Sequence, residues 1–577
     1  MSDSAHPPRS ALTALRERGS RSTWIRNWRA WLPAAMLAVA VLAQGIFLGR
    51  IANTLYFLWG DDDDFLLERG TVTGVDKGWW APHDDHWSTG TILIYRALFA
   101  VFGLRTYLPY GLVPILMHLA LGVVLYLLLV RLGTARWQAL GPALIVVTLG
   151  AGGGAILWSV TMGSIGAVLL GFLAVYVAAG RDTVDSALRP MWILLVIALT
   201  LSGVGITAVA FATAFATFRW GWRAGARVMS VPLVIFVVWF VFFGWGGVKE
   251  KLDTWAYADV PDMLAEAMTT HLQRLFVFPG SGLVALLVLV GVVLFVRETP
   301  WPLRQLGLAG VLTAFFQITL AGITRPSFGI SNFELSRYGY FTCVFLAPAM
   351  AILIGLIWPR IAQPRWVAAV LAVWLLAAIM INGQRLFHQE QSTRELISGQ
   401  NPGLLKGIRK AAQQGQPVLT QAGCDFLTFR FRADLIAREE MWSKLPAGEP
   451  TEQDLVNAEG WYFVGVDQEQ QLPVEMAPRL EFGDGWSRDT RLKKGCATYK
   501  ALGDKPELAL AAYGAGAQTG ILGPTAKMTT VLERDGVVGP SRDWEVDPRT
   551  TTFVGTSAHE ATLRVTLHAP GDYYICT

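Results

Sequence analysis

The stretch between Trp31 and Asn382 is a succession of long apolar runs separated by short charged segments. An α-helix needs about 20 predominantly apolar residues to cross the hydrocarbon core of a bilayer. By this criterion we expect a polytopic α-helical membrane domain with eleven spans, at residues 31–58, 108–130, 139–157, 161–180, 191–203, 205–218, 228–247, 281–296, 306–323, 338–357 and 366–383. Two of these, 191–203 and 205–218, are short, so Ser202 to Gly205 must form a tight turn between them.

Composition marks a second region that begins after Gln384. Of the 577 residues, 53% are hydrophobic and 16% are charged, whereas soluble proteins carry nearer a quarter charged residues. The deficit of charge ends at Gln384, so we predict a cytoplasmic segment at 1–30, a membrane domain at 31–383 and a soluble domain at 384–577. The formal net charge of +4 is too small to indicate nucleic-acid binding. Arg far outnumbers Lys, and Ala and Gly are abundant, which is typical of high-GC bacteria such as actinobacteria.

Arginines in alternate loops predict the orientation of the chain, because cytoplasmic loops carry an excess of basic residues. With eleven spans these arginines all fall on one side, which puts the N-terminus in the cytoplasm and the soluble domain outside the plasma membrane. They are Arg9, Arg16, Arg18, Arg21, Arg26, Arg29, Arg131, Arg136, Arg181, Arg189, Arg219, Arg223, Arg227, Arg297, Arg304, Arg360 and Arg365. The first apolar run continues to Trp59, past any cleavage site, so we interpret it as an uncleaved anchor.

The soluble region begins with a polar helical stalk at 384–416 and becomes rich in strands towards its end. Short alternating segments between Gly, Pro and Asp turns predict strands at 417–420, 461–466, 529–532, 551–554, 562–567 and 572–576. This β-rich domain could bind carbohydrate or cap the membrane domain. Its three cysteines, Cys424, Cys496 and Cys576, allow one disulfide if the domain is outside the cell. The alternative is three unrelated buried thiols, as we expect for Cys343 in the membrane domain.

The first outer loop, residues 60–107, carries the residues best suited to catalysis. Asp61, Asp62, Asp63 and Asp64 directly follow the first span. Four adjacent carboxylates repel one another, so the pKa of at least one is raised unless a cation compensates. A carboxylate with a shifted pKa suits a general base. The alternatives are a solvated loop or a helix cap.

A second polar run in the same loop reads His83-Asp84-Asp85-His86-Trp87. Its side chains could lie near an acceptor or hold a metal, and a divalent cation is the one cofactor that the sequence suggests. The two histidines, however, are three residues apart rather than four, and no spacing fixes a third ligand.

Together these features resemble the GT-C superfamily of membrane glycosyltransferases. The resemblance covers residues 30–385 and rests on the acidic motif after the first span, the His83-x-x-His86-Trp87 segment, the amphipathic stretch from Thr91 to Phe102, and the second span with His118. It implies an inverting transfer of a sugar from a polyprenyl-phosphate donor to a cell-envelope glycan, lipid or protein acceptor on the outer face. It also implies that one of the four Asp is the base. We favour Asp62 or Asp63, although this chain has four Asp where the family usually has two.

Basic residues and one tyrosine elsewhere are candidates for binding the donor phosphate. An Arg at the mouth of a span can hold a phosphate through paired hydrogen bonds. These candidates are Arg325, Arg337 and Tyr338 before the tenth span, His271 and Arg274 in an expected interfacial helix at 263–276, and Lys77 in the first loop. For Arg337 and Tyr338, anchoring at the membrane interface is an equally favoured alternative to phosphate binding. His118 we expect to be a buried neutral histidine.

A transporter or flippase of a lipid-linked precursor is the main alternative function. Ion-coupled transporters place ionisable side chains inside the bilayer, and the expected spans contain no Asp or Glu. Phosphoethanolamine transfer and polymer ligation would need a similar outer pocket. A scaffold that only displays the soluble domain would need neither eleven spans nor the acidic run.

Overall fold

The computed structural model describes most of the chain. The described residues are 28–57, 61–69, 78–84, 86–246, 260–276, 281–296, 299–324, 336–361, eight isolated positions between 373 and 395, 401–414, 422–424, 429–456, 464–466, 479–483, 486–491, 496–502, 506–511, 518–534, 536–539, 541–546, 552–555 and 562–576.

The chain divides into two compact units, and each is described by itself. Unit 1 comprises Met1–Leu48, Pro114–Ile156 and Ser164–Phe387, and unit 2 comprises Gly49–Val113, Leu157–Gly163 and His388–Thr577. Residues 60–107 therefore belong to the same unit as the C-terminal region.

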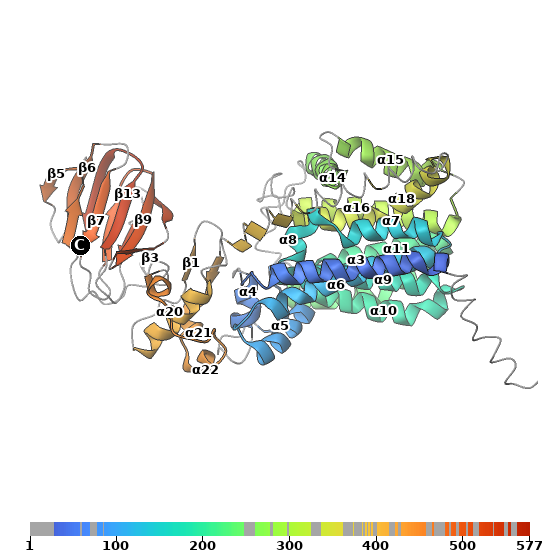
Figure 1. Cartoon of the computed structure of the whole chain (residues 1–577), viewed down its shortest axis with the longest axis horizontal. Coiled ribbons are helices and arrows are strands. Elements are labelled where there is room, and N and C mark those ends of the chain that lie inside the picture. The colour runs from blue at the N-terminus through green and yellow to red at the C-terminus, as the bar shows by residue number, and fades with distance from the viewer. Residues whose placement is uncertain are drawn as a thin grey trace, which may run out of the picture. The chain divides into compact units, whose positions relative to one another are not determined.

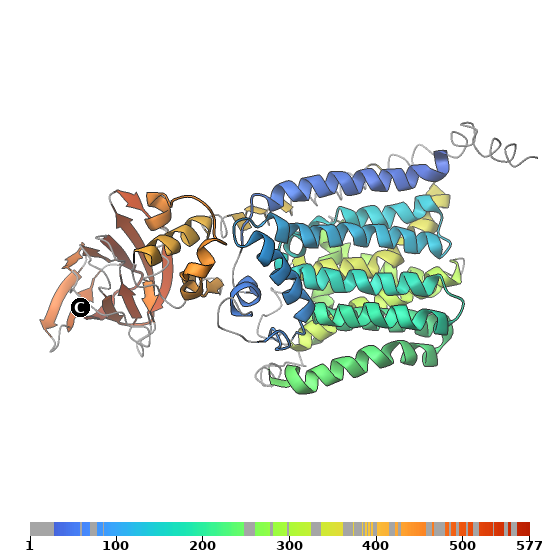
Figure 2. The ribbon, with the colours of Figure 1, turned by 90° about the horizontal axis from the view of Figure 1, so that it is seen from below.

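Unit 1 is helical, and its long helices lie side by side with nearly parallel axes (Figures 1 and 2). Most of their residues are apolar, so tertiary packing and a lipid environment both favour the helical state. The helices are α3 (Trp28–Ala52), α6 (Leu108–Arg131), α7 (Arg136–Val147), α8 (Gly153–Ile156), α9 (Met162–Ala179), α10 (Val184–Leu201), α11 (Val204–Trp220), α12 (Trp222–Trp239), α14 (Val260–Phe276), α15 (Ser281–Phe295), α16 (Trp301–Thr324) and α18 (Ser336–Ile361).

Seven of these helical segments are long and apolar enough to cross a membrane. They confirm a polytopic helical domain and correspond to the spans expected at 31–58, 108–130, 161–180, 191–203, 228–247, 306–323 and 338–357. Helices α11 and α15 are apolar but shorter than 18 residues. The span expected at 366–383 lies outside the described residues except for Val373.

The expected span at 139–157 is not one helix. Helix α7 ends at Val147, a 3₁₀ turn follows at Gly150–Gly152, and α8 occupies Gly153–Ile156. Three consecutive glycines, 152–154, fall in this stretch, and glycine weakens a helix because it loses the most backbone entropy on folding.

The tight turn expected between 191–203 and 205–218 is present. Helix α10 ends at Leu201 and α11 begins at Val204. A Cβ atom on Gly205 would lie 2.4 Å from the carbonyl oxygen of Ala198, so only glycine fits this close approach.

Exposure separates central from peripheral helices in unit 1. In α18, 72% of the most apolar 18-residue window is buried, whereas in α3 and in the α12 segment only 17% is buried. The exposed apolar side chains of α12, which include Leu233, Val234 and Val237, are suited to contact with lipid.

Unit 2 combines short helices with a β-sandwich. The helical segments are α4 (Asp61–Asp63), a π-helical turn at Asp64–Glu68, α5 (Thr89–Phe102), a 3₁₀ turn at Ser159–Thr161, α20 (Asn401–Gln413), α21 (Ala433–Ile436) and α22 (Glu439–Trp442). Two short strands, β1 (Ala422–Cys424) and β2 (Phe429–Phe431), form a separate antiparallel pair.

The sandwich confirms the predicted β-rich C-terminal region. One sheet has the strand order β10-β9-β13-β7-β4, with β11 also paired to β9, and the other has the order β3-β12-β8-β14-β6-β5. The strands are β3 (Val464–Val466), β4 (Arg479–Phe482), β5 (Trp486–Arg491), β6 (Cys496–Ala501), β7 (Glu507–Ala511), β8 (Gln518–Leu522), β9 (Ala526–Arg534), β10 (Val537–Val538), β11 (Arg542–Val546), β12 (Thr552–Gly555), β13 (Thr562–Leu567) and β14 (Gly571–Cys576).

One apolar core lies between the two sheets. Met528 and Val565 from the first sheet and Ile521 and Tyr573 from the second belong to the same buried cluster. Side chains from two inner faces that interdigitate in this way are the usual core of a β-sandwich.

Candidate active site

The four consecutive aspartates form about one turn at the start of a short helical segment in unit 2. Asp61 to Asp63 make up α4, and Asp64 opens the π-helical turn that continues it. Because a helix turns the side chains in different directions, the four carboxylates have different surroundings. Asp62, Asp63 and Asp64 are buried, with 0%, 6% and 8% of their surface exposed, whereas the side chain of Asp61 is 38% exposed.

Asp62 lies in a buried hydroxyl network. The Tyr95 hydroxyl donates to Asp62 Oδ1 at 2.5 Å, and Ser159 Oγ donates to the same oxygen at 3.0 Å. The two hydroxyl oxygens are themselves 2.9 Å apart. Burial and the neighbouring carboxylate raise the pKa of Tyr95 well above its ordinary value, so Tyr95 remains a donor. The network joins α4, α5 and the 3₁₀ turn at Ser159.

Asp63 contacts the C-terminal part of unit 2. Its Oδ1 accepts a hydrogen bond from the backbone N–H of Arg432 at 3.1 Å. The Arg432 guanidinium makes two hydrogen bonds to Asp434, at 2.8 and 2.7 Å, which holds the segment in place. Also within unit 2, the Asn401 side chain donates to the carbonyl oxygen of Phe57 at 2.6 Å.

Asp64 is shared by two cationic groups. Its Oδ2 accepts from Arg69 Nε at 2.7 Å and lies 2.7 Å from His83 Nδ1. The other ring nitrogen of His83, Nε2, lies 3.3 Å from Asp61 Oδ1. The imidazole therefore bridges the partly exposed Asp61 and the buried Asp64.

This bridge determines the charge of His83. Burial alone would lower its pKa, but the hydrogen bonds and negative charges of Asp61 and Asp64 outweigh burial and raise the pKa from 6.5 to about 10. At neutral pH the ring is an imidazolium. The cationic compensation that four adjacent carboxylates require thus comes from His83 and Arg69.

Arg69 also holds the second polar run against the first. Its guanidinium donates to the carbonyl oxygens of Gly78 at 3.2 Å, Ala81 at 2.7 Å and Pro82 at 2.8 Å. With the Asp64 bond, four acceptors fix a side chain that is only 3% exposed. Arg69 therefore sets the path of residues 78–82 and places His83 between the two aspartates.

The turn that follows is tight and carries two of the remaining candidates. Backbone hydrogen bonds of 3.0 and 2.8 Å join His83 and His86 in both directions, and Asp84 has a left-handed backbone with φ of 55°, which Asp tolerates better than most residues. Asp84 is exposed, His86 is partly buried, and Asp85 lies outside the described residues.

The described side chains of this cluster contact one another. Both ring nitrogens of His83 face carboxylates. Within the described part of the chain, no group of three or more His, Cys, Asp and Glu residues is arranged to hold a metal ion.

Three of the phosphate-binding candidates lie together in unit 1, between α14 and α18. His271 is buried, and its Nδ1 lies 3.2 Å from Thr342 Oγ1. The Arg337 guanidinium carbon lies 5.2 Å from the centroid of the Tyr338 ring. His271 thus contributes to helix packing. Lys77, Arg325 and the Arg274 side chain lie outside the described residues.

His118 has a structural environment. It is fully buried in α6, with Nδ1 3.1 Å from the Tyr340 hydroxyl and Nε2 3.1 Å from the carbonyl oxygen of Val147. It joins α6, α7 and α18, as expected for a buried histidine bonded to neighbouring helices.

Several residues of the site were missed by sequence reasoning. Arg69 and Lys77 are the two basic residues between the acidic run and His83, and only Lys77 was considered. Tyr95 and Ser159 are 33 and 97 residues from Asp62 along the chain, so no local spacing links them. Arg394, whose guanidinium carbon lies 5.5 Å from the Trp158 ring centroid, is a further buried cation in unit 2.

Similarity to known proteins is found among solved structures but not in the sequence comparisons. No protein-family model and no curated protein sequence matches this chain. One similar solved structure is ArnT from Cupriavidus metallidurans bound to undecaprenyl phosphate, with 15% identity, a TM-score of 0.42, and coverage of 74% of this chain and 88% of that one. Another is the Archaeoglobus fulgidus oligosaccharyltransferase tethered to an acceptor peptide, with 12% identity, a TM-score of 0.32, and coverage of 74% and 62%. Both TM-scores are below 0.5, so neither similarity supports a function for this chain.

Proposed function

We propose that this protein is a membrane glycosyltransferase of the GT-C type. It transfers a sugar from a polyprenyl-phosphate donor to a glycan, lipid or protein acceptor of the cell envelope, with Asp61 as the general base. The observation that supports this function most strongly is the exposed carboxylate of Asp61. It lies at the surface of an otherwise buried cluster, beside a cationic histidine.

Solvent exposure favours Asp61 as the general base over Asp62 and Asp63, the two residues favoured from the sequence. A general base must come within hydrogen-bond reach of the proton that it removes. Asp62 is fully buried and accepts two hydroxyl donors, and Asp63 is 6% exposed and accepts a backbone N–H. Asp64 is 8% exposed and bonds Arg69 and His83. Asp61 alone among the four can meet an acceptor without a rearrangement of the cluster.

The proposed reaction is a single displacement. Asp61 accepts the proton of an acceptor hydroxyl while the oxygen forms a bond to the anomeric carbon of the donor sugar. The bond between that carbon and the phosphate oxygen breaks, and the polyprenyl phosphate leaves with the electron pair. Attack on the face opposite the leaving group inverts the anomeric configuration.

Cationic groups would stabilise the departing phosphate. Arg337 remains a prediction from the sequence for this role, because a guanidinium can bind phosphate through two hydrogen bonds. His83 and Arg69 have a different role, since both are committed to Asp61 or Asp64. They keep the carboxylates ionised and in place.

The charges in the spans do not favour ion-coupled transport. In the seven candidate spans of the described chain, the one acidic side chain is Asp185, in the first turn of α10. It is exposed and pairs with Arg227, so it does not form a relay within the bilayer.

The test uses the purified full-length protein with radiolabelled polyprenyl-phosphate sugars and an envelope extract as the acceptor. Asp61→Asn should lower kcat by about 10²–10⁴-fold, as expected for loss of a general base. Asp185→Asn is the control, because that carboxylate is exposed at a helix terminus, and it should transfer at the wild-type rate. Full activity in a folded Asp61→Asn variant would exclude Asp61 as the base, and no transfer by the wild type from any donor would exclude the reaction.

A further inference from the structure

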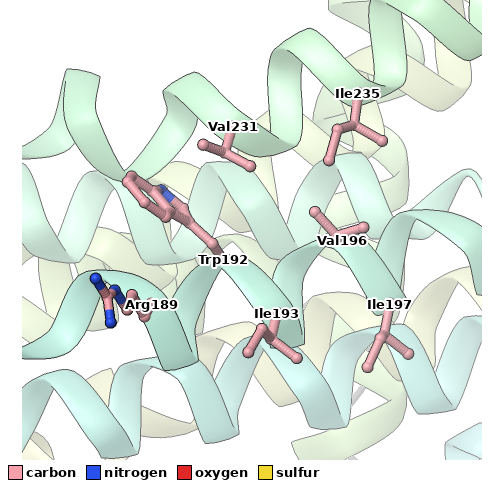
Figure 3. Close-up of a pocket in the computed structure, with 7 residues that line it drawn as sticks. All are labelled: Arg189, Trp192, Ile193, Val196, Ile197, Val231 and Ile235. Carbon is pink, nitrogen blue, oxygen red and sulfur yellow. The ribbon is translucent and has the colours of Figure 1, made fainter.

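A groove lies on the surface of unit 1 between α10 and α12 (Figure 3). Its volume is about 460 Å³, within the usual range for small-molecule sites. The lining side chains are Arg189, Trp192, Ile193, Val196 and Ile197 from α10, and Val231 and Ile235 from α12.

The groove has one cationic end and an otherwise apolar lining. Arg189 is the charged residue among the seven, and the remaining six are Ile, Val and Trp. On α10, Arg189 and Ile197 are separated by eight residues, or about 12 Å along a helix axis. One leaflet contributes about half of the 30 Å hydrocarbon core, so the apolar part matches the depth of a single leaflet.

Contacts between the two helices fix the cationic end. Trp192 Nε1 donates to the carbonyl oxygen of Arg227 at 3.0 Å, and Arg227 pairs with Asp185. Both contacts join α10 to α12 near Arg189. The groove is therefore present before any ligand binds, which reduces the entropic cost of binding.

We propose that this groove binds one anionic glycerophospholipid. Its phosphate contacts the Arg189 guanidinium, and one acyl chain lies along Ile193, Ile197 and Ile235. Arginine binds phosphate through paired hydrogen bonds, and a basic cluster favours anionic lipids. Arg223, which is exposed, adds positive charge at this end of α12. The alternation of arginines along the chain puts this end in the cytoplasmic leaflet.

A phospholipid fits this groove better than a helix of a second copy of the chain. A transmembrane helix would need a complementary surface along the full span, whereas the groove covers about one leaflet. The single charge at its end also matches a headgroup rather than an apolar helix.

The test places the full-length protein in nanodiscs that contain phosphatidylglycerol or phosphatidylcholine with a photoreactive diazirine in the acyl chain. After irradiation, mass spectrometry maps the labelled peptides. Phosphatidylglycerol should label residues 189–197 and 231–235 several-fold more than the exposed face of α15, which carries Leu283 and Leu287. Phosphatidylcholine should label both regions equally. Arg189→Gln should remove the preference for phosphatidylglycerol.

Two further variants separate the groove from general attraction to basic residues. Arg223→Gln removes an exposed charge of α12 that does not line the groove, so it should reduce the preference for phosphatidylglycerol far less than Arg189→Gln does. Val196→Trp fills the groove and should reduce labelling by both lipids. Equal labelling of α10 and α15 by phosphatidylglycerol, an undiminished signal in Arg189→Gln, or a groove occupied by a second copy of the chain would each overturn the proposal.

Discussion

His83 shows how one residue can stabilise a cluster of like charges. Its two ring nitrogens lie 2.7 and 3.3 Å from Asp64 and Asp61, and Arg69 shares the Asp64 oxygen. Without these two cations, four adjacent carboxylates would have to be neutralised by protonation or exposed to water. The cluster therefore depends on the protonation of His83.

This dependence predicts a pH-dependent contribution to stability. The pKa of His83 is raised from 6.5 to about 10 in the folded state, so its stabilising effect is fully present below pH 6.5. The effect decreases as the pH rises through about 10, and its size is on the order of a few kcal/mol. The difference in Tm between wild type and His83→Gln should therefore shrink between pH 6.5 and pH 10.5. The exposed His388→Gln is the control and should show no such trend. A constant difference in Tm across this range would contradict the prediction.

Tyr95 provides a second test at this scale. Tyr95→Phe leaves the buried Asp62 without its 2.5 Å donor, and an unsatisfied buried partner costs about 1–3 kcal/mol. Tyr126→Phe is a matched control, because the buried Tyr126 hydroxyl has no hydrogen-bond partner among the described residues. Chemical or thermal unfolding in detergent should show a loss of stability for Tyr95→Phe and little change for Tyr126→Phe. Equal effects would show that the hydroxyl network does not stabilise the cluster.

The end of helix α5 and the residues that follow it contact the C-terminal part of unit 2. At its end, the backbone N–H of Leu104 donates to the carbonyl oxygen of Lys444 at 2.7 Å, and Lys444 Nζ donates to the carbonyl oxygen of Ala100 at 2.9 Å. Arg105 donates to the carbonyl oxygen of Ser443. Such backbone contacts require the two segments to approach closely.

Gly103 permits this approach, and its substitution should disrupt it. Its φ is +60°, and an added Cβ would lie 2.6 Å from the Lys444 oxygen. Gly103→Ala should cost about 1–3 kcal/mol from backbone strain, with a further loss from the clash. Gly133→Ala is the control. The φ of Gly133 is +91°, and no described atom lies within 4 Å of the added Cβ, so this substitution causes backbone strain without a clash. Limited proteolysis should cleave residues 439–448 faster in Gly103→Ala than in Gly133→Ala. Similar rates would show that the contact with Lys444 is not the determining factor.

Helices and strands could be predicted from the sequence where the pattern of neighbouring residues determines them. Apolar length was sufficient to identify helices such as α6, α16 and α18, and alternation identified β13 and β14. The stretch at 139–157 was misread because apolar length outweighed its glycines. The partners of Asp62 could not be predicted, because Tyr95 and Ser159 reach it only through tertiary packing.

The same limit applies to the choice of the base. The acidic run was identified from composition and position, but the exposure of each carboxylate depends on how α4 packs. Nothing in the sequence distinguishes Asp61 from Asp62, because both are aspartates in one unbroken run. The structure separates them by their partners and by their exposed fractions of 38% for the Asp61 side chain and 0% for Asp62.

At the scale of the whole molecule, the orientation of the chain in the membrane determines whether the β-sandwich lies in a compartment where disulfides persist. The arginine pattern predicts that the C-terminal domain is outside the cell, where disulfides persist. In the backbone, Cys576 of β14 is directly opposite Cys496 of β6. Opposed residues in antiparallel strands have Cα atoms about 4.5–5.5 Å apart, within the range that a disulfide spans. Of the three pairings that the tail cysteines allow, this register favours Cys496 with Cys576.

We therefore expect a Cys496–Cys576 disulfide in protein isolated from native membranes, with Cys424 as a free thiol. Digestion under non-reducing conditions should yield one cross-linked peptide pair that separates on reduction. Cys576→Ser should expose Cys496 to maleimide, whereas Cys424→Ser should leave the cross-link intact. In thermal unfolding, the cross-link should stabilise the sandwich by about 2–4 kcal/mol, because it restricts the unfolded chain. A cytoplasmic domain would keep both thiols reduced, so full labelling of Cys496 and Cys576 in the wild type would contradict the predicted orientation as well as the disulfide.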